Sequence, residues 1–261
     1  MAFAIFTDIH GNLEAMEAIL RDIHKRRHKI SQTFFLGDAV TFGSDSSACL
    51  KLLQKYNVNC VVGNHEQRLF KYEKTVAEMT PAGIKHMEYI FRSLDNDDIR
   101  FIKSMPLELS VDYKGYKLHF AHYTHDENGV VLEDMDYFRE DLLDKLFKDK
   151  DCDVAFLGHL HERKLYIRST GRSYFCLDSS GCVYGDKTHY TYFDIGATEK
   201  NNFDIYRHEV KFDRAKFDRK MHERPIPEKE RFGKKYFGID FSNSVDNPQS
   251  DIVDLSIGDD K

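Results

Sequence analysis

The sequence predicts an α/β fold in which short buried strands alternate with helices. Three observations lead to this prediction. Apolar runs of strand length recur through the first two thirds of the chain, and each ends in glycine or polar residues. Segments of helical periodicity separate these runs, which favours parallel strands covered by helices on both faces. Beyond residue 162 strand-like segments follow one another through short turns, so we expect either one mixed sheet or two stacked sheets.

The first strand is expected over residues 2–7, AFAIFT, which are nearly all apolar, as in a strand buried on both faces. A turn containing Gly11 follows, and a helix begins at Leu13 with one apolar stripe. Further strands are expected in QTFFLGD (32–38), NCVVGNHE (59–66), YKLHFAHY (116–123) and DVAFLGHLH (153–161). Helices are expected over roughly 45–56, 65–78, 82–103 and 134–149.

The later part of the chain is predicted to be mainly antiparallel. Residues 163–181 are typical of a hairpin that turns at 170–172, and the segments 189–196 and 202–212 are expected to pair. Two prolines lie within 223–240, and a short helix is expected after them. We expect one domain over 1–240 and a polar, mobile tail over 241–261.

Composition excludes several classes of protein. Hydrophobic residues make up 41% of the 261 residues and charged residues 31%, as in ordinary globular proteins. The net charge of −6 and the lack of a long basic block disfavour binding to duplex nucleic acid. No apolar run is long enough to span a membrane, and the first residues do not resemble a signal peptide. Five scattered cysteines without a C-x-x-C pattern predict reduced thiols in the cytoplasm.

The tripeptide DIH occurs twice, at 8–10 and at 22–24. Asp22 and His24 lie within a predicted helix, where residues two apart point about 200° apart around the axis. They cannot converge on one ion, and we expect them on a solvated face. Asp8 and His10 leave the end of a strand on the same side. Only the first copy is therefore a candidate metal site.

Polar groups follow each of the predicted core strands, at the carboxyl ends where α/β proteins bind ligands. Imidazole, carboxylate and amide oxygen suit divalent ions such as Mn²⁺, Fe²⁺ or Zn²⁺. There are too many ligands for one ion, so we expect two ions that share a carboxylate. The candidates are Asp8, His10, Asp38, Asn64, His65, His122, His159 and His161.

This ordered set, D-x-H, G-D, G-N-H-E, H and G-H-x-H over about residues 3–162, resembles the calcineurin-like metallophosphoesterase superfamily. The segment GDAVTFGSDS (37–46) is similar to the small bacterial branch, which includes relatives of diadenosine tetraphosphate hydrolases, phosphodiesterases and some protein phosphatases. The resemblance implies a sandwich of two mixed sheets flanked by helices. Ser179-Ser180-Gly181 departs from the family's Asn-Pro-Gly-Ser segment, and we interpret it as a turn at a strand end.

The resemblance also implies a role for each candidate. One metal would be held by Asp8, His10 and His161, and the other by Asn64, His122 and His159. Asp38 would bridge both, together with a hydroxide that attacks phosphorus. His65 would contact the substrate phosphate or protonate the leaving group, with Asn64 beside it. Mn²⁺ is the first expectation, with Fe, Zn or Mg as alternatives.

Two further segments have open interpretations. Arg68, one helical turn after His65, either contacts a phosphate or is a solvated helix arginine. Residues 65–105 form either a helical cap that shapes substrate choice or helices packed on the sheet. His119 is expected to be a hydrogen-bonded core histidine, with a position behind a metal ligand as the alternative.

The leading functional prediction is a cytoplasmic, two-metal phosphoesterase. Its substrates would be small phosphodiesters or nucleotides, and dinucleoside polyphosphates are a specific possibility. The alternatives are a phosphoprotein phosphatase and a catalytically weak metal-binding scaffold for other proteins. The oligomeric state is left open by the sequence.

Overall fold

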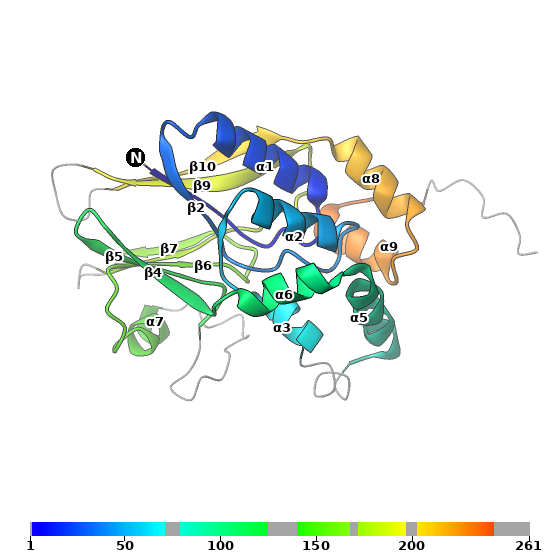
Figure 1. Ribbon diagram of the computed structural model, residues 1–261, viewed down its shortest axis with the longest axis horizontal. Helices are drawn as coiled ribbons and strands as arrows, with labels where there is room; N and C mark the ends of the chain where they lie inside the picture. The colour runs from blue at the N-terminus through cyan, green and yellow to red at the C-terminus, as the bar shows by residue number, and fades with distance from the viewer. Residues whose placement is uncertain (1, 71–78, 125–139, 168–171, 197–202, 243–261) are drawn as a thin grey trace, which may run out of the picture.

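Two five-stranded sheets stack face to face in the computed structural model, which describes residues 2–70, 79–124, 140–167, 172–196 and 203–242 (Figure 1). The first sheet has the order β10-β9-β1-β2-β3, formed by β10 (Phe203–Lys211), β9 (Lys187–Ile195), β1 (Ala2–Phe6), β2 (Ile30–Phe35) and β3 (Asn59–Cys60). The second has the order β4-β5-β6-β8-β7, formed by β4 (Glu108–Tyr113), β5 (Tyr116–Ala121), β6 (Val154–Leu157), β8 (Ser173–Cys176) and β7 (Lys164–Ile167).

Each sheet has a parallel centre and antiparallel edges. β1, β2 and β3 are parallel, as are β5, β6 and β8. β9 pairs antiparallel with β1 and β10, while β4 and β7 pair antiparallel with β5 and β8. The antiparallel pairs predicted after residue 162, β7 with β8 and β9 with β10, are therefore confirmed. In addition, β8 pairs parallel with β6, and the antiparallel pair of β4 and β5 precedes residue 162. Residues 168–171 of the predicted hairpin turn lie outside the described part of the chain.

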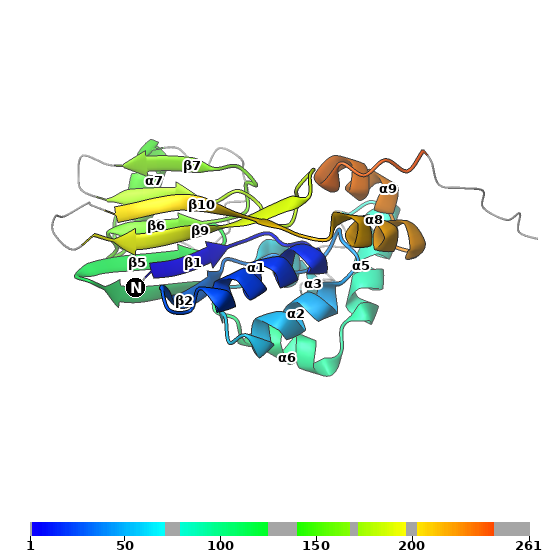
Figure 2. The same ribbon diagram turned by 90° about the horizontal axis from the view of Figure 1, so that it is seen from above.

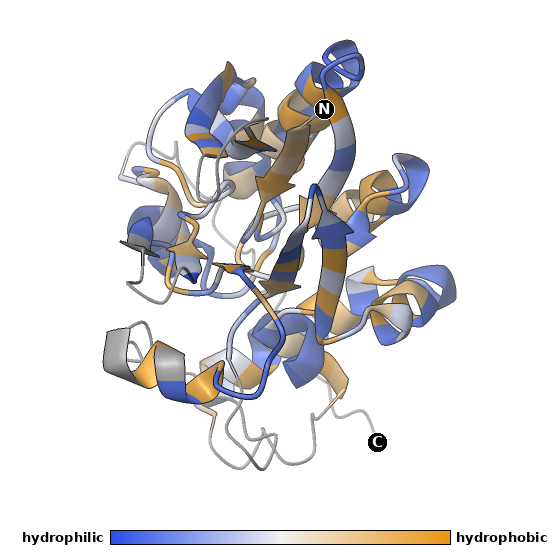
Figure 3. Ribbon diagram, turned by 90° about the vertical axis from the view of Figure 1, so that its left-hand side faces the viewer, coloured by the Kyte–Doolittle hydropathy of each residue, from blue (hydrophilic) through white to orange (hydrophobic). Residues whose placement is uncertain are grey.

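The core between the sheets is built from aromatic and aliphatic side chains. Phe3, Ile5 and Phe34 from the first sheet meet Phe120 and Phe156 from the second, and the rings of Phe34 and Phe120 stack with centroids 3.9 Å apart. The strands carry much of the hydrophobic sequence (Figure 3). Helices were expected on both faces of the parallel strands. Instead, helices cover only the outer faces, and each sheet covers the inner face of the other.

The helices lie on the outer faces and beyond one end of the strands. α1 (Leu13–Lys25) covers the first sheet and α7 (Glu140–Leu146) lies against the second (Figure 1). The others are α2 (Ser46–Lys55), α3 (Asn64–Phe70), α5 (Pro81–Ser93), α6 (Asn96–Ser104), α8 (Arg214–Glu223), α9 (Lys229–Phe232) and the short π-helix η2 (Gly233–Phe237). Figure 2 shows α5, α8 and α9 together beyond the strand ends.

One predicted helix was wrong. The helix expected over 82–103 is two helices, because Asp95 caps α6 by accepting hydrogen bonds from the backbone N–H groups of Asp97 and Asp98. The helices expected over 65–78 and 134–149 are described as α3 over Asn64–Phe70 and α7 over Glu140–Leu146, and 71–78 and 134–139 lie outside the described residues. β4 and α8 were not predicted. The short helix expected after the prolines is present as α9.

The segment 65–105, for which a cap was one interpretation, packs closely where it is described. Met87 and Ile90 of α5 and Ile102 of α6 are buried in the cluster that covers the outer side of the first sheet. These two helices therefore serve as packing elements, whatever further role the segment has. Among the described residues, no helix combines the length and apolar character needed to cross a membrane.

Candidate metal centre

The carboxyl ends of five strands, three from one sheet and two from the other, meet at one place. The loops after β1 and β2 and the start of α3 after β3 face the loops after β5 and β6. Hydrogen bonds join these loops, such as those from Asp8 N–H to Gly37 carbonyl and from Gly158 N–H to His122 carbonyl. All eight predicted site residues lie in these loops or at the start of α3.

One group of donors surrounds Oδ1 of Asp8. His161 Nε2 lies 3.2 Å from this oxygen and His10 Nε2 lies 3.7 Å from it. The two imidazole nitrogens are 3.1 Å apart. The other carboxylate oxygen, Oδ2, accepts hydrogen bonds from the Thr7 hydroxyl at 2.6 Å and the His159 N–H at 3.2 Å. Asp8 is thus oriented with one oxygen toward the two histidines.

A second group surrounds Oδ1 of Asn64. His122 Nε2 lies 2.9 Å from this oxygen and His159 Nδ1 lies 3.0 Å from it. His122 Nε2 is also 3.2 Å from Asp38 Oδ2. On the far side of its ring, Nδ1 of His122 donates to the Leu36 carbonyl at 2.6 Å, so Nε2 is the nitrogen that a neutral His122 ring would offer to a metal.

Asp38 lies between the two groups. Its Oδ2 is 3.2 Å from His122 Nε2 in the second group and 3.8 Å from His10 Nε2 in the first. Its Oδ1 accepts a hydrogen bond from the backbone N–H of His65 at 2.9 Å. One carboxylate oxygen is therefore fixed by backbone, and the other faces both groups.

The donors fit divalent cations. Asp8 Oδ1 is buried and makes no hydrogen bond within the described structure, although imidazoles surround it. Buried polar atoms without partners are rare unless a ligand or ion completes them. Ligand atoms of His10, Asp38 and His65 lie within 4.8 Å of one another, as do those of Asp38, His122 and His159. Nitrogen and oxygen donors at this spacing match borderline divalent ions.

The electrostatics of the metal-free protein also favour cation binding at this site. Burial opposes ionisation of Asp8 and Asp38, but neighbouring histidines hold both carboxyl pKa values well below normal. Burial likewise opposes protonation of His122 and His161, but the nearby carboxylates raise the His122 pKa to about 9 and the His161 pKa to about 11. The carboxylates thus attract positive charge, which metal ions would supply in place of protons.

His65 stands at the mouth of the site. Its side chain is 15% exposed, and its Nε2 lies 4.0 Å from Asp38 Oδ2. Its Nδ1 is 3.0 Å from the Thr41 hydroxyl, and burial lowers its pKa. Since His65 also lies within metal-binding distance of His10 and Asp38, its predicted role apart from the metals remains a prediction.

Backbone strain is concentrated here. Of ten non-glycine residues with positive φ in the described structure, seven lie in these loops, at residues 8, 10, 38, 41, 42, 159 and 161. Such conformations cost about 1–3 kcal/mol each and persist where surrounding contacts enforce them. Position 63 has no room for a side chain, because a Cβ on Gly63 would lie 2.1 Å from Asp38 Oδ1.

The sequence analysis missed the residue that holds the Asp38 loop. Glu66, quoted only as the last letter of G-N-H-E, is buried and accepts hydrogen bonds from the backbone N–H groups of Asp38, Ala39, Val40 and Gly63 at 2.7–3.2 Å. Burial, followed by the charge of Asp38, raises its pKa to about 7. The acidic residue directly after His65 in the sequence could have indicated a carboxylate that holds the loops of the site.

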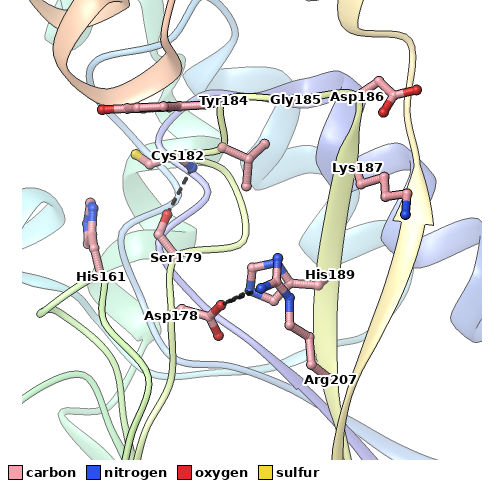
Figure 4. Close-up of a pocket in the computed structure, with 11 residues that line it drawn as sticks. His161, Asp178, Ser179, Cys182, Tyr184, Gly185, Asp186, Lys187, His189 and Arg207 are labelled. Atoms are coloured by element: carbon pink, nitrogen blue, oxygen red, sulfur yellow. Dashed lines mark hydrogen bonds and ion pairs between the residues drawn. The ribbon is translucent and has the colours of Figure 1, made fainter.

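Ser179-Ser180-Gly181 is more than a turn at a strand end. Ser179 Oγ donates to the Asp8 carbonyl at 2.7 Å, and the Ser180 N–H donates to the Thr7 carbonyl at 2.9 Å. The segment thus supports the loop that carries Asp8. A pocket of about 410 Å³ opens beside it and beside His161, with Tyr184, Lys187 and Arg207 among its lining residues (Figure 4).

The remaining histidines and charged residues lie elsewhere. Asp22 was expected to be solvated, but it is half-buried and contacts Arg26, the Tyr190 hydroxyl and His208. It takes no part in the site, as predicted. His119 faces Glu108 at 3.6 Å and the Phe147 ring. Arg68 is half-buried on α3, and its charge acts on His65.

Fold and site together define a metal-dependent phosphoesterase. The sequence matches the calcineurin-like phosphoesterases over residues 1–163, and the chain belongs to this family. The uncharacterized protein MJ0912 of Methanocaldococcus jannaschii is 31% identical over 178 residues, which are 63% of this chain and 70% of that protein.

Two solved structures show the same fold. A metallophosphoesterase from Sphaerobacter thermophilus has a TM-score of 0.63 at 18% identity and covers 89% of this chain and 99% of its own. The hypothetical protein PH1004 from Pyrococcus horikoshii has a TM-score of 0.72 at 17% identity and covers 91% and 98%. The predicted fold class, two mixed sheets flanked by helices, is confirmed.

Proposed function

We propose that this protein is a cytoplasmic two-metal phosphoesterase that hydrolyses small phosphodiesters or nucleotides, with dinucleoside polyphosphates as a specific candidate. The observation that carries the proposal is the placement of Asp38 Oδ2 within 3.8 Å of donors from both ligand groups. Two cations in such a site, when bound, neutralise charge on phosphate oxygens and lower the pKa of bound water.

The residues divide into two sets of ligands in this proposal. Asp8, His10 and His161 hold the first cation, Asn64, His122 and His159 hold the second, and Asp38 serves both. Mn²⁺ is the first ion to test. Hydrogen bonds to the backbone fix the far side of several ligands, such as His10 Nδ1 to the Val40 carbonyl at 3.1 Å. These bonds keep the facing nitrogen unprotonated.

His65 is the proposed acid. It lies in the first turn of α3 and is partly exposed at the mouth of the site, so a substrate phosphate can reach it. Its contact with Thr41 fixes one ring nitrogen and leaves the other directed toward Asp38. In this position His65 donates to a phosphate oxygen or to the leaving group. Arg68 extends the positive charge beside it.

The test is a substrate panel with purified protein. Phosphomonoesters, phosphodiesters, cyclic nucleotides, dinucleoside polyphosphates and phosphopeptides are compared with Mn²⁺ and with a chelator. The proposal expects chelator-sensitive turnover of a diester or nucleotide. Preference for phosphopeptides would favour a phosphoprotein phosphatase. Metal binding without turnover of any member of the panel would favour the scaffold alternative.

A further inference from the structure

Cys182 differs from the other four cysteines of the chain. Cys49, Cys60, Cys152 and Cys176 are buried, whereas Cys182 is only partly buried. It follows Ser179-Ser180-Gly181, the segment that packs on the loop carrying Asp8 and His10. Figure 4 shows its sulfur on the same side of the pocket as His161.

The position of Cys182 is tightly enforced. The Gly181 N–H donates to the Asp8 carbonyl at 3.1 Å, and the Gly181 carbonyl accepts from the Asn12 side chain at 2.9 Å. A Cβ on Gly181 would lie 2.0 Å from the Ile9 carbonyl oxygen. The Cys182 N–H donates to Ser179 Oγ at 2.9 Å. The backbone that carries the Cys182 side chain is therefore fixed against the loop of Asp8.

The thiol completes a cluster of metal-binding atoms. Ligand atoms of His10, His161 and Cys182 all lie within 4.8 Å of one another. Ligands around a tetrahedral cation are separated by about 3.3–3.8 Å, as follows from bond lengths of about 2.0–2.3 Å. The distances of 3.2 and 3.7 Å from Asp8 Oδ1 to the two histidines match this spacing.

A second observation indicates that an ion belongs here. Asp8 Oδ1 is buried and lies 3.2 Å from His161 Nε2 and 3.7 Å from His10 Nε2, yet it accepts no well-directed hydrogen bond in the described structure. Two imidazoles and one sulfur thus lie together, and the carboxylate oxygen of Asp8 lies beside the same two imidazoles. This donor set is softer than the set around Asn64, where the neighbouring donors are nitrogen and oxygen.

We propose that Cys182 is a ligand of the first cation and makes that position selective for thiophilic ions such as Zn²⁺ or Fe²⁺ over Mn²⁺ or Mg²⁺. The proposal rests on the two-metal site described above. Sulfur is a soft donor that favours Zn²⁺ and iron, while Mn²⁺ and Mg²⁺ prefer oxygen. The thiol proton is released to solvent as the sulfur–metal bond forms.

The test is a titration of the metal-free protein with Co²⁺, followed by absorption spectroscopy. A cobalt–thiolate bond gives an intense sulfur-to-cobalt charge-transfer band in the near ultraviolet, whereas imidazole and carboxylate ligation gives visible ligand-field bands only. We expect both kinds of band in the native protein. Cys182→Ser should lose the charge-transfer band and keep ligand-field bands. Cys152→Ala, which changes a buried cysteine elsewhere, should keep both.

Competition between metals measures the selectivity. Losing a group that only hydrogen-bonds a metal ligand typically lowers metal affinity roughly 10–100-fold. Cys182→Ser should lower Zn²⁺ affinity by at least this factor and change Mn²⁺ affinity less. Cobalt bound without a charge-transfer band in the native protein would overturn the role of Cys182 and leave the proposed function standing. Absence of any cobalt binding would instead overturn the two-metal site itself.

Discussion

Asp38 connects the two halves of the metal centre through one oxygen. Its Oδ1 is held by the His65 N–H, so the carboxylate cannot turn without losing this hydrogen bond. Its Oδ2 is left facing His122 and His10. The backbone of Asp38 has a φ of 61°. The Glu66 carboxylate helps to enforce this conformation by accepting a hydrogen bond from the Asp38 N–H. In the proposed two-metal site, this one side chain would lie between the two cations.

Asp38→Asn is expected to remove most activity and to lower the metal content below two ions per chain. The amide keeps the shape but loses the negative charge that attracts both cations. The loss of activity should exceed the roughly 10–100-fold loss that is typical when a group hydrogen-bonded to a metal ligand is mutated. Elemental analysis measures the metal content, and the rate with the best substrate of the panel measures the activity. Asp22→Asn is the matched control and should change neither; equal metal content in both variants would contradict the bridging role.

His65→Ala is expected to retain both metals and lose on the order of 10²–10⁴ in rate, the usual size of an acid–base contribution. The physical reason is that His65 lies at the exposed mouth of the site, 4.0 Å from Asp38 Oδ2. His24→Ala, on the exposed face of α1, is the control. If the His65 variant bound fewer metal ions than the control, His65 would have to be a ligand.

At the scale of elements, α5 supports the site from outside through His86. Its Nε2 accepts the Phe42 N–H at 3.3 Å, and its Nδ1 donates to the Pro227 carbonyl at 3.0 Å. Phe42 in turn packs against the rings of His10 and His65 with centroids 4.5 and 4.8 Å apart. A helix of the 65–105 segment is thus joined to two site histidines through one buried side chain.

His86→Leu is expected to destabilise the protein by about 1–3 kcal/mol, because two backbone groups lose hydrogen-bond partners. Burial lowers the His86 pKa in the folded protein. The stabilisation that neutral His86 gives to the fold is therefore fully present above about pH 6.5, the pKa of histidine in the unfolded chain. It is lost as pH falls through the lower pKa of His86 in the folded protein. Denaturant unfolding at several pH values measures both effects.

The matched control for His86→Leu is His222→Leu, at a partly buried position on α8. The control should change stability less. A stability difference between the native protein and His86→Leu that stayed constant from pH 5 to 8 would contradict the neutral, buried state assigned to His86. Swapping α5 for a relative's helix additionally tests whether the 65–105 segment shapes substrate choice.

At the scale of the whole molecule, the site exists because two sheets meet at their strand ends. Asp8 and Asp38 come from the first sheet, while His122 and His161 come from the second. Attraction between these groups holds the sheets together at this edge in the metal-free protein. Cations bound between them would replace that attraction and strengthen the contact, since ligands that bind only the folded state stabilise it.

Metal removal is expected to lower the Tm, and the difference should grow with pH. In the metal-free protein the ion pairs of His122 and His161 stabilise the fold below their unfolded pKa of about 6.5. This contribution is lost as pH rises through folded pKa values of about 9 and about 11. Metal binding needs neutral imidazoles and strengthens over the same range.

Thermal unfolding with Mn²⁺ and with a chelator, between pH 6.5 and 9, measures this difference. Calorimetry in buffers of different ionisation enthalpy should also detect protons released when the metal binds. A Tm difference that shrinks as pH rises would contradict the exchange of protons for cations at these histidines.

The sequence alone determined the parts of this protein that depend on neighbouring residues. An apolar run followed by glycine and a polar group marks a strand end, as at Gly37-Asp38 and Gly158-His159. The geometry of residues two apart separated Asp8 and His10 from Asp22 and His24. Order and spacing of these signals were enough to predict the fold class and the residues that gather at the site.

Only the tertiary structure decided which donors face one another and what holds them. Glu66 meets the loop of Asp38 across 28 positions of sequence, and His161 meets Asp8 across 153. The sulfur of Cys182 reaches the same cluster because its segment packs on the β1–α1 loop. These contacts depend on how two sheets stack, and stacking is set by the whole core, beyond any local pattern in the chain.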